Sequence, residues 1–225
     1  MGKQTGELCE FWDAVRFANW LHNGQPTGPQ NASTTEDGAY TLNGYTGSDG
    51  REIQRKASWQ WAVTSEDEWY KAAYYKGGSS NAYWDYPMQS DIPTVPSNDI
   101  TNLDAGNNAN FYQSGYTLGS PYYRTEAGEF ENSESHYGTF DQGGNVREWH
   151  EALPYDGQPW RGLRGGCFYF TDPSLRAPYR QSSSEASYED NGIGFRVSAV
   201  PEPSSILILG SGIVTLAGII RGRNG

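Results

Sequence analysis

Cysteine, histidine and positive charge are all scarce in this chain of 225 residues. The two cysteines, Cys9 and Cys167, form no Cys-x-x-Cys pair, and their spacing leaves open whether they join in a disulfide. The 27 acidic residues outnumber the 16 lysines and arginines and give a formal charge of -11. Such a charge repels phosphate backbones, so nucleic acid is disfavoured as a partner.

Motifs of the common catalytic centres are also missing. The chain has no phosphate-binding loop and no G-x-S-x-G elbow, and its three histidines, His22, His136 and His150, show no metal-ligand spacing. We therefore expect the histidines to be surface or packing residues.

What is abundant is aromatic side chains and glycine. The chain holds 16 Tyr, 8 Trp and 28 Gly, which favours a loop-rich domain whose core is built from aromatic rings. Apolar spacing predicts a helix from residue 11 to a stop at Asn23-Gly24. Ser65 and Glu68 form a capping-box pattern that predicts a second helix closed by Lys76-Gly77-Gly78. We expect short strands at 40–42, 160–170 and 192–200 within one α+β domain over residues 1–199.

The end of the chain, residues 200–225, differs from the rest. Residues 204–220 carry no charge, and at about 1.5 Å each they are just long enough to cross a thin bilayer as an apolar helix. Arg221 and Arg223 follow, which places that end in the cytoplasm and the body outside. Together with Pro201-Glu202-Pro203, this segment resembles the PEP-CTERM sorting signal of exported bacterial proteins.

This resemblance implies export, processing by a membrane enzyme of the exosortase type, and delivery to the cell envelope or the medium. Before processing, the protein would be anchored in the membrane by its C-terminal segment. An exported protein also needs an N-terminal signal, and "MGKQTGELCEFWDAV" has no apolar core. We therefore expect that the domain is N-terminally incomplete.

Several stretches in the body appear together in one order: "FWDAVRFANWL", "TSEDEWYKAAYYKGG", "YGTFDQGGNVREW", "RGLRGGCFYF" and "NGIGFRVSA". In this combination the chain resembles the formylglycine-generating enzyme family, also called sulfatase-modifying factor domains. The resemblance implies a compact domain with few regular elements and an architecture similar to C-type lectins. Enzymes of this family are oxidoreductases that convert a sulfatase cysteine to formylglycine with a copper ion held by two cysteines.

The positions that match the copper cysteines hold Phe170 and Leu175 in this chain. Cys167 stands where the family usually has serine, so it is not a displaced copper ligand. Because copper(I) binds soft thiolates and these are missing, no copper is expected. We interpret Cys167 as a small buried residue.

Calcium is the cofactor that the sequence does predict. The loop "DQGGNVRE" offers two carboxylates around a Gly-Gly turn, which suits a hard cation, although a solvated turn without metal is the alternative. The resemblance implies two structural calcium sites. The first would use Asp141, Gln142, Gly144, Val146 and Glu148, the middle three through carbonyls. The second would use Asn110, Phe111, Glu126 and Gly128.

One substitution in the family pattern concerns Arg147, which replaces a tryptophan. If its side chain points inward, a cation enters an aromatic layer and requires a carboxylate partner.

Three functions follow from these features. The first is a divergent, non-catalytic surface domain sorted by the tail. The second is a formylglycine-generating-type oxidase that acts on an exported partner. The third is a calcium-dependent carbohydrate-binding module, in which aromatic faces stack on a polysaccharide.

Overall fold

In the computed structural model, residues 8–78, 82–102 and 105–200 are described. In these described ranges, the α-helices α1 and α2 and the 3₁₀ helix η2 accompany six strands, β1 to β6. The bounds of the helices are Phe11–His22 for α1, Glu66–Tyr74 for α2 and Asp172–Leu175 for η2. The strands span Trp61–Val63 (β1), Arg147–His150 (β2), Arg161–Arg164 (β3), Gln181–Ser184 (β4), Ile193–Phe195 (β5) and Val197–Ala199 (β6).

Both predicted helices are confirmed, with their signals in place. In α1 the residues Phe11, Val15 and Ala18 face the core, and the helix ends before Gly24, whose φ is 79°. At the start of α2 the Ser65 hydroxyl accepts the Glu68 amide, and the Glu68 carboxylate accepts the Ser65 amide. These reciprocal bonds satisfy two amides that the first turn leaves free. The helix stops at Tyr74, a little before the predicted glycines.

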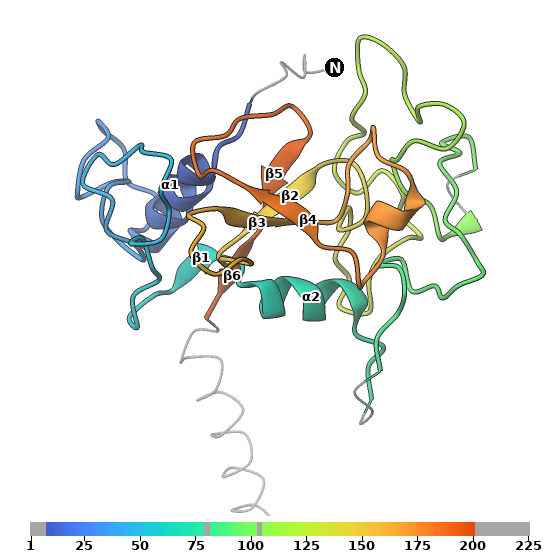
Figure 1. The fold of residues 1–225 in the computed structure, drawn as a ribbon, viewed down its shortest axis with the longest axis horizontal. Coiled ribbons are helices and arrows are strands. Elements are labelled where there is room, and N and C mark those ends of the chain that lie inside the picture. Colours follow the sequence, from blue (N-terminus) through green and yellow to red (C-terminus); the bar gives the residue numbers. More distant parts are fainter. Residues whose placement is uncertain (1–7, 79–81, 103–104, 201–225) are drawn as a thin grey trace, which may run out of the picture.

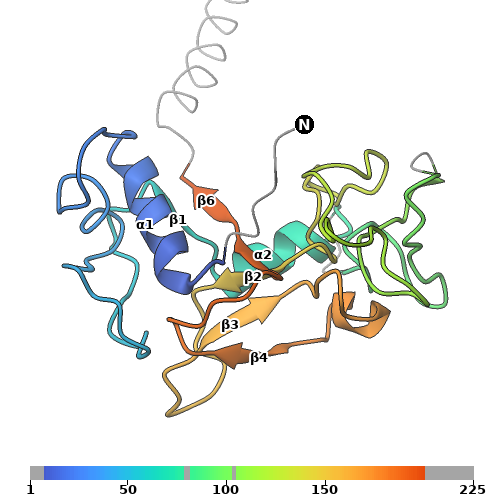
Figure 2. The ribbon, with the colours of Figure 1, turned by 90° about the horizontal axis from the view of Figure 1, so that it is seen from above.

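The strands form two small sheets. In the larger one the order is β4-β3-β2-β5, with β2 parallel to β5 and the other neighbours antiparallel. The other sheet pairs β1 with β6 antiparallel, from Trp61↔Ala199 to Val63↔Val197. Figure 1 shows α1 on one side of these sheets and the long loops before β2 on the other, and Figure 2 shows the same division from above.

The main core lies between α1 and the sheets. Phe11 of α1 contacts Trp149 of β2 edge to face, with ring centroids 6.0 Å apart. Val63 of β1 and Leu163 of β3 belong to the same buried cluster. Aromatic rings bury a large area for few ordered residues, which lets a chain with short elements fill its interior.

One predicted strand segment was wrong and another was longer than the strand that forms. Residues 40–42 form no strand, because the Tyr40 amide donates to the Asn19 side chain instead of to a neighbouring strand. The strand expected over 160–170 ends at Arg164, since Gly165 and Gly166 turn the chain with φ of 96° and 68°. The apolar helix expected at 204–220 lies outside the described residues. Within the part of the chain that is described, no helix is long and apolar enough to cross a membrane.

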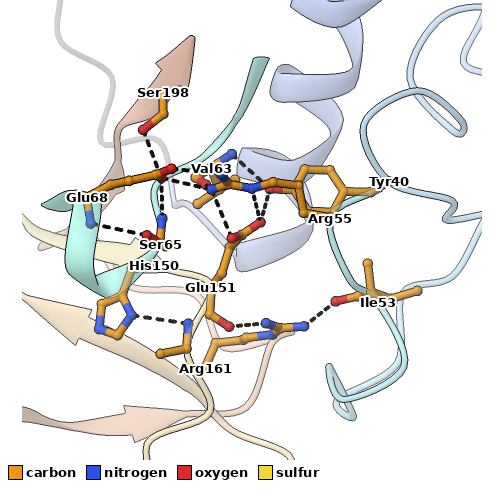
Figure 3. Close-up of polar contacts among 11 residues, drawn as sticks. Tyr40, Ile53, Arg55, Val63, Ser65, Glu68, His150, Glu151, Arg161 and Ser198 are labelled. Carbon is orange, nitrogen blue, oxygen red and sulfur yellow. Dashed lines mark hydrogen bonds and ion pairs between the residues drawn. The ribbon is translucent and has the colours of Figure 1, made fainter. Parts of the chain in front are cut away.

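A charged network joins the long loop after α1 to both sheets and to α2 (Figure 3). Arg55 from this loop donates to both carboxylate oxygens of Glu68, each at 2.9 Å, and its Nε donates to Glu151 at 3.0 Å. It also donates to the Val63 carbonyl of β1 at 2.6 Å. The Tyr40 hydroxyl donates to Glu151 as well. Arg55 therefore holds a segment without secondary structure against three separate elements.

The ionisation of Glu68 reflects this pairing. Burial opposes its charge, but hydrogen bonds from Arg55 and from the Ser65 amide outweigh burial and lower its pKa to about 2. The folded state thus keeps Glu68 ionised well below the pKa of an unfolded chain. The stability that this carboxylate contributes is present above its ordinary pKa and is lost as the pH falls towards 2.

We expect Arg55→Ala to destabilise the fold by about 2–4 kcal/mol, because it leaves two partly buried carboxylates, Glu68 and Glu151, without a partner that is itself only 14% exposed. The measurement is the urea midpoint at pH 7. The matched control is Arg51→Ala, since Arg51 pairs with Asp49 at the surface with both side chains more than a third exposed, 47% and 37%. That change should leave the urea midpoint nearly unchanged, because an ion pair at the surface contributes little to stability. Equal midpoints for the two variants would contradict the role given to Arg55.

Candidate functional site

The loop from Asp141 to Glu148 crosses two other backbone segments at close range. The Asn145 amide donates to the Asn110 carbonyl at 2.7 Å, and the Gly144 amide donates to the Gly165 carbonyl at 2.8 Å. A Cβ at Gly144 would lie 2.3 Å from the Asn110 carbonyl oxygen, which no real side chain tolerates. Glycine at this position therefore lets two distant segments meet at the loop.

Asp141 and Glu148 both turn into this crossing. Glu148 is 4% exposed, and its Oε2 accepts from Trp69 Nε1 at 2.7 Å and from Arg196 Nε at 2.6 Å. Asp141 Oδ2 accepts the Gly128 amide at 2.7 Å. Burial raises the pKa of both carboxyl groups, and the charge of Asp141 adds to the shift on Glu148. Glu148, which is buried, thus pairs with Arg196, and the partly buried Asp141 lies close enough to feel the charge of the same guanidinium.

Arg196 is a partner that the sequence reading missed. Besides Glu148, it donates to the Phe140 carbonyl and thereby ties the link between β5 and β6 to the loop. The only signal in the sequence was the stretch "GIGFRV", where an arginine stands among residues of a buried strand. The Arg196 side chain is partly buried, at 23% exposed, and Glu148 supplies the carboxylate that such a cation favours.

The first predicted calcium set contains two carboxylates, a negative charge that suits a divalent cation. Burial raises the pKa of Asp141, the pKa of Glu148 is raised by burial and also by the charge of Asp141, and Arg196 supplies a single positive charge. A calcium ion would balance the remaining charge, with Asp141 and Glu148 as carboxylate ligands and the carbonyls of Gln142, Gly144 and Val146 as further donors. Among the described residues no three His, Cys, Asp or Glu side chains cluster as metal ligands. The carbonyls would therefore have to supply the rest of the shell.

The second predicted set is less well assembled. Asn110 fits, because its side chain is 1% exposed and its Oδ1 has no hydrogen-bond partner. The Phe111 carbonyl, however, already accepts from the Asn98 side-chain amide at 3.2 Å, and Glu126 is exposed. The Gly128 amide is directed to Asp141 of the first set. The structure thus places part of the second set against the first.

The Arg147 side chain points inward and pairs with a carboxylate. Its side chain is 8% exposed, and its Nη2 lies 3.4 Å from Asp190 Oδ1. The same oxygen accepts the Tyr169 hydroxyl and the Gly192 amide, each at 2.8 Å. The guanidinium also lies over the Phe170 ring, 5.7 Å from its centroid. The sequence indicated the need for an acidic partner but not that Asp190 would be the one.

Cys167 lies beside this group and is 0% exposed. Burial raises the pKa of its thiol to about 11, although hydrogen bonding to Tyr169 and the charge of Arg147 act in the opposite direction. The thiol is therefore protonated at neutral pH and is a poor nucleophile. Cys9 and Cys167 are both free thiols, which answers the question of their pairing.

Phe170 and Leu175 lie at the two positions that match the copper cysteines. Leu175 is 0% exposed and packs in an apolar cluster with Tyr86, Met88 and Phe111. Phe170 packs edge to face on Tyr169, with ring centroids 4.9 Å apart. Neither side chain can ligate a metal, so these residues do not fit copper(I).

A cleft of about 500 Å³ lies elsewhere, between α1, α2 and the strands β5 and β6. It is lined by Phe17, Thr64, Glu68, Trp69, Ala72, Thr139, Gln142, Phe195, Arg196, Val197 and Ser198. Cys167, Phe170 and Leu175 are not among its lining residues. Of the two residues at positions that match the family's copper cysteines, Leu175 is fully buried among apolar side chains and Phe170 is partly buried.

These features define a small α+β domain with a glycine-dependent loop crossing and an acidic, partly buried loop. The chain matches the Sulfatase-modifying factor enzyme 1-like domain family over residues 7–200. It belongs to this family, and the predicted family is thereby confirmed. No curated protein matches the chain.

Two solved structures share the fold. The crystal structure of CarF is 20% identical with a TM-score of 0.55, and the match covers 86% of this chain and 67% of that one. Treponema denticola variable protein 1 is 17% identical with a TM-score of 0.52, and the match covers 86% of this chain and 70% of the other. At such identities the likeness concerns the fold alone.

We expect calcium to raise the melting temperature of the protein, because an ion that binds only the folded state stabilises it by mass action. Asp141→Asn should lose most of this shift, and in chelator at pH 7 it should be more stable than the wild type. The reason is that the raised pKa of Asp141 makes its ionised form unfavourable in the fold, and Asn removes that charge.

The pH dependence gives a second readout. Without calcium, the destabilisation by Asp141 is fully present above its folded pKa and vanishes below its ordinary value of 3.8. The difference between wild type and Asp141→Asn in chelator should therefore disappear at about pH 3. Asp99→Asn, at an exposed loop carboxylate, is the control for the calcium effect. An unchanged wild-type melting temperature on chelation would count against the site.

Proposed function

We propose that this domain is a divergent, non-catalytic member of its family that serves as a binding module at the cell envelope. The observation that carries the proposal is the identity and packing of Phe170 and Leu175. Both occupy positions matched to copper thiolates, and Leu175 is fully buried in an apolar cluster. Formylglycine formation by the family's route needs those thiolates.

The surroundings of Cys167 support the same reading. A nucleophilic cysteine requires a base or a cation that stabilises the thiolate. Here burial outweighs the nearby charge of Arg147, so the pKa is raised to about 11. Asp190, the nearest carboxylate, is already held by Tyr169, Gly192 and Arg147. An oxidase acting on an exported partner, the alternative function, would need ligands that these positions do not offer.

We expect the purified full-length protein to form no aldehyde on a sulfatase-type cysteine peptide after incubation with copper(I) under air. The reason is that its only two thiols are Cys9 and Cys167, and burial raises the pKa of both. Mass spectrometry of the peptide is the measurement, with a catalytically active family member as positive control. Stoichiometric copper(I) binding together with aldehyde formation would overturn the proposal.

Export is the second part of the proposal. It is supported by the sequence of residues 201–225, which lies outside the described residues: a Pro-Glu-Pro entry, an uncharged span and a basic end. We infer that an exosortase-type enzyme removes the segment after Pro203 and that the body is then released or attached at the cell surface. Calcium, which is abundant outside cells, would bind the body there.

We expect processing of the tail in a host with the matching sorting machinery when an N-terminal signal peptide is supplied. Alanines at Pro201, Glu202 and Pro203 should leave membrane insertion intact, since residues 204–220 remain uncharged, but should block cleavage. The uncut form would then accumulate in membranes, as seen by immunoblot and mass spectrometry. If the protein with the native Pro201, Glu202 and Pro203 still ended at Gly225 after export, the processing step would be contradicted.

A further inference from the structure

We propose that three tyrosines, Tyr112, Tyr116 and Tyr123, form a surface that binds the sugar rings of a neutral polysaccharide. The proposal deepens the proposed function, since it names the ligand class of a binding module. We call these residues the tyrosine surface. They lie on the loops that precede β2, which Figures 1 and 2 show on the side of the sheets opposite α1.

The rings of the tyrosine surface form a continuous run. Tyr112 contacts Tyr116 at 5.2 Å between centroids, and Tyr116 contacts Tyr123 at 4.9 Å, both close to edge to face. Tyr123 then stacks on Phe168 at 5.5 Å, with 17° between the ring planes. Tyr112 and Tyr116 are 37% and 47% exposed, whereas Phe168 is 5% exposed. Two exposed tyrosines are thus connected through Tyr123 to a buried ring.

The loop that carries Tyr112 and Tyr116 is fixed before any ligand arrives. The Tyr112 amide donates to the Phe170 carbonyl at 2.8 Å, and the Asn98 side-chain amide donates to the carbonyls of Phe111 and Gly115 at 3.2 and 3.0 Å. These bonds tie the loop to two other segments. A preformed surface loses little conformational entropy on binding, which favours affinity for a ligand with few contacts.

The chemistry of the tyrosine surface suits a sugar better than an anion. Each tyrosine offers an apolar face for the C–H groups of a pyranose ring and a hydroxyl for hydrogen bonds at its edge. Exposed apolar clusters with polar rims mark interaction sites. The chain's formal charge of -11 repels nucleic acids and anionic lipids. A neutral polysaccharide matches the tyrosines through its ring C–H groups and hydroxyls, and it is not repelled by the negative charge of the chain.

Arg124 is the cation next to this surface in sequence, and it follows Tyr123 directly. An acidic polysaccharide bound through this guanidinium is therefore the competing ligand. The two alternatives differ in the residue on which binding depends. Loss of a tyrosine ring would remove stacking on a neutral sugar, whereas loss of Arg124 would remove an ion pair with a uronate.

The test is affinity electrophoresis of the full-length protein in native gels that contain laminarin, xylan, galactomannan or dextran, with alginate as the acidic polymer. We expect retardation by at least one neutral polymer. Tyr116→Ala should weaken it about tenfold, as expected for loss of one stacked ring. Tyr116→Phe should retain most of it, because the ring remains. Thermal melting of each variant checks that the fold is intact.

Tyr155→Ala is the matched control. Tyr155 is 48% exposed, similar to Tyr116, and belongs to the loop between β2 and β3, which Figure 2 shows on the other side of the sheet from the loops before β2. Its loss should leave retardation unchanged. Failure of every neutral polymer, equal loss in Tyr155→Ala and Tyr116→Ala, or retardation by alginate alone that requires Arg124 would each overturn the inference. None of these outcomes bears on formylglycine formation, so the proposed function is tested separately.

Discussion

The fold depends on the charged contacts of Arg55. This residue comes from a stretch between α1 and β1 that has no regular structure, yet its guanidinium joins Glu68 of α2, Glu151 after β2 and the Val63 carbonyl of β1. Short strands bury little area each, so such a domain cannot rely on extended sheets alone to position its loops. Hydrogen bonds and ion pairs from one loop to several elements hold that loop in position instead. Arg161 acts in the same way, since it donates to the carbonyls of Glu151, Gly50 and Ile53.

The loop from Asp141 to Glu148 shows how such ordering shapes a possible metal site. Gly144 permits the approach of the Asn110 carbonyl, and the crossing brings Asp141 and Glu148 into a place that raises the pKa of both. Arg196 compensates one of the two charges. A structural cation would hold this loop, and the loops bound to it, in place where no strand pairing orders them. The same loop also holds segment 167–170, because the Phe168 amide donates to the Asn145 carbonyl, and Tyr123 of the tyrosine surface stacks on Phe168.

The family's chemistry and this chain diverge at a few side chains on a retained backbone. Arg147, which pairs with Asp190, stands where the family pattern has a tryptophan. Leu175 stands where the pattern has a cysteine, and it packs in an apolar cluster. The exposed rings of Tyr112 and Tyr116 lie on loops that contact segment 167–170 through Tyr123, Phe168 and Tyr169.

The sequence by itself determined the family, both helices and their caps, because spacing at helical period and the Ser65–Glu68 pair are local signals. It also determined that Phe170 and Leu175 cannot hold copper, since that depends only on residue type. It did not reveal β1, β2 or β4, which are three or four residues long and exist only through pairing with distant partners. The partners of Arg147 and Glu148, namely Asp190 and Arg196, were likewise decided by the tertiary structure. Long-range ion pairs leave no periodic trace in a sequence, because the two residues meet only after the chain has folded.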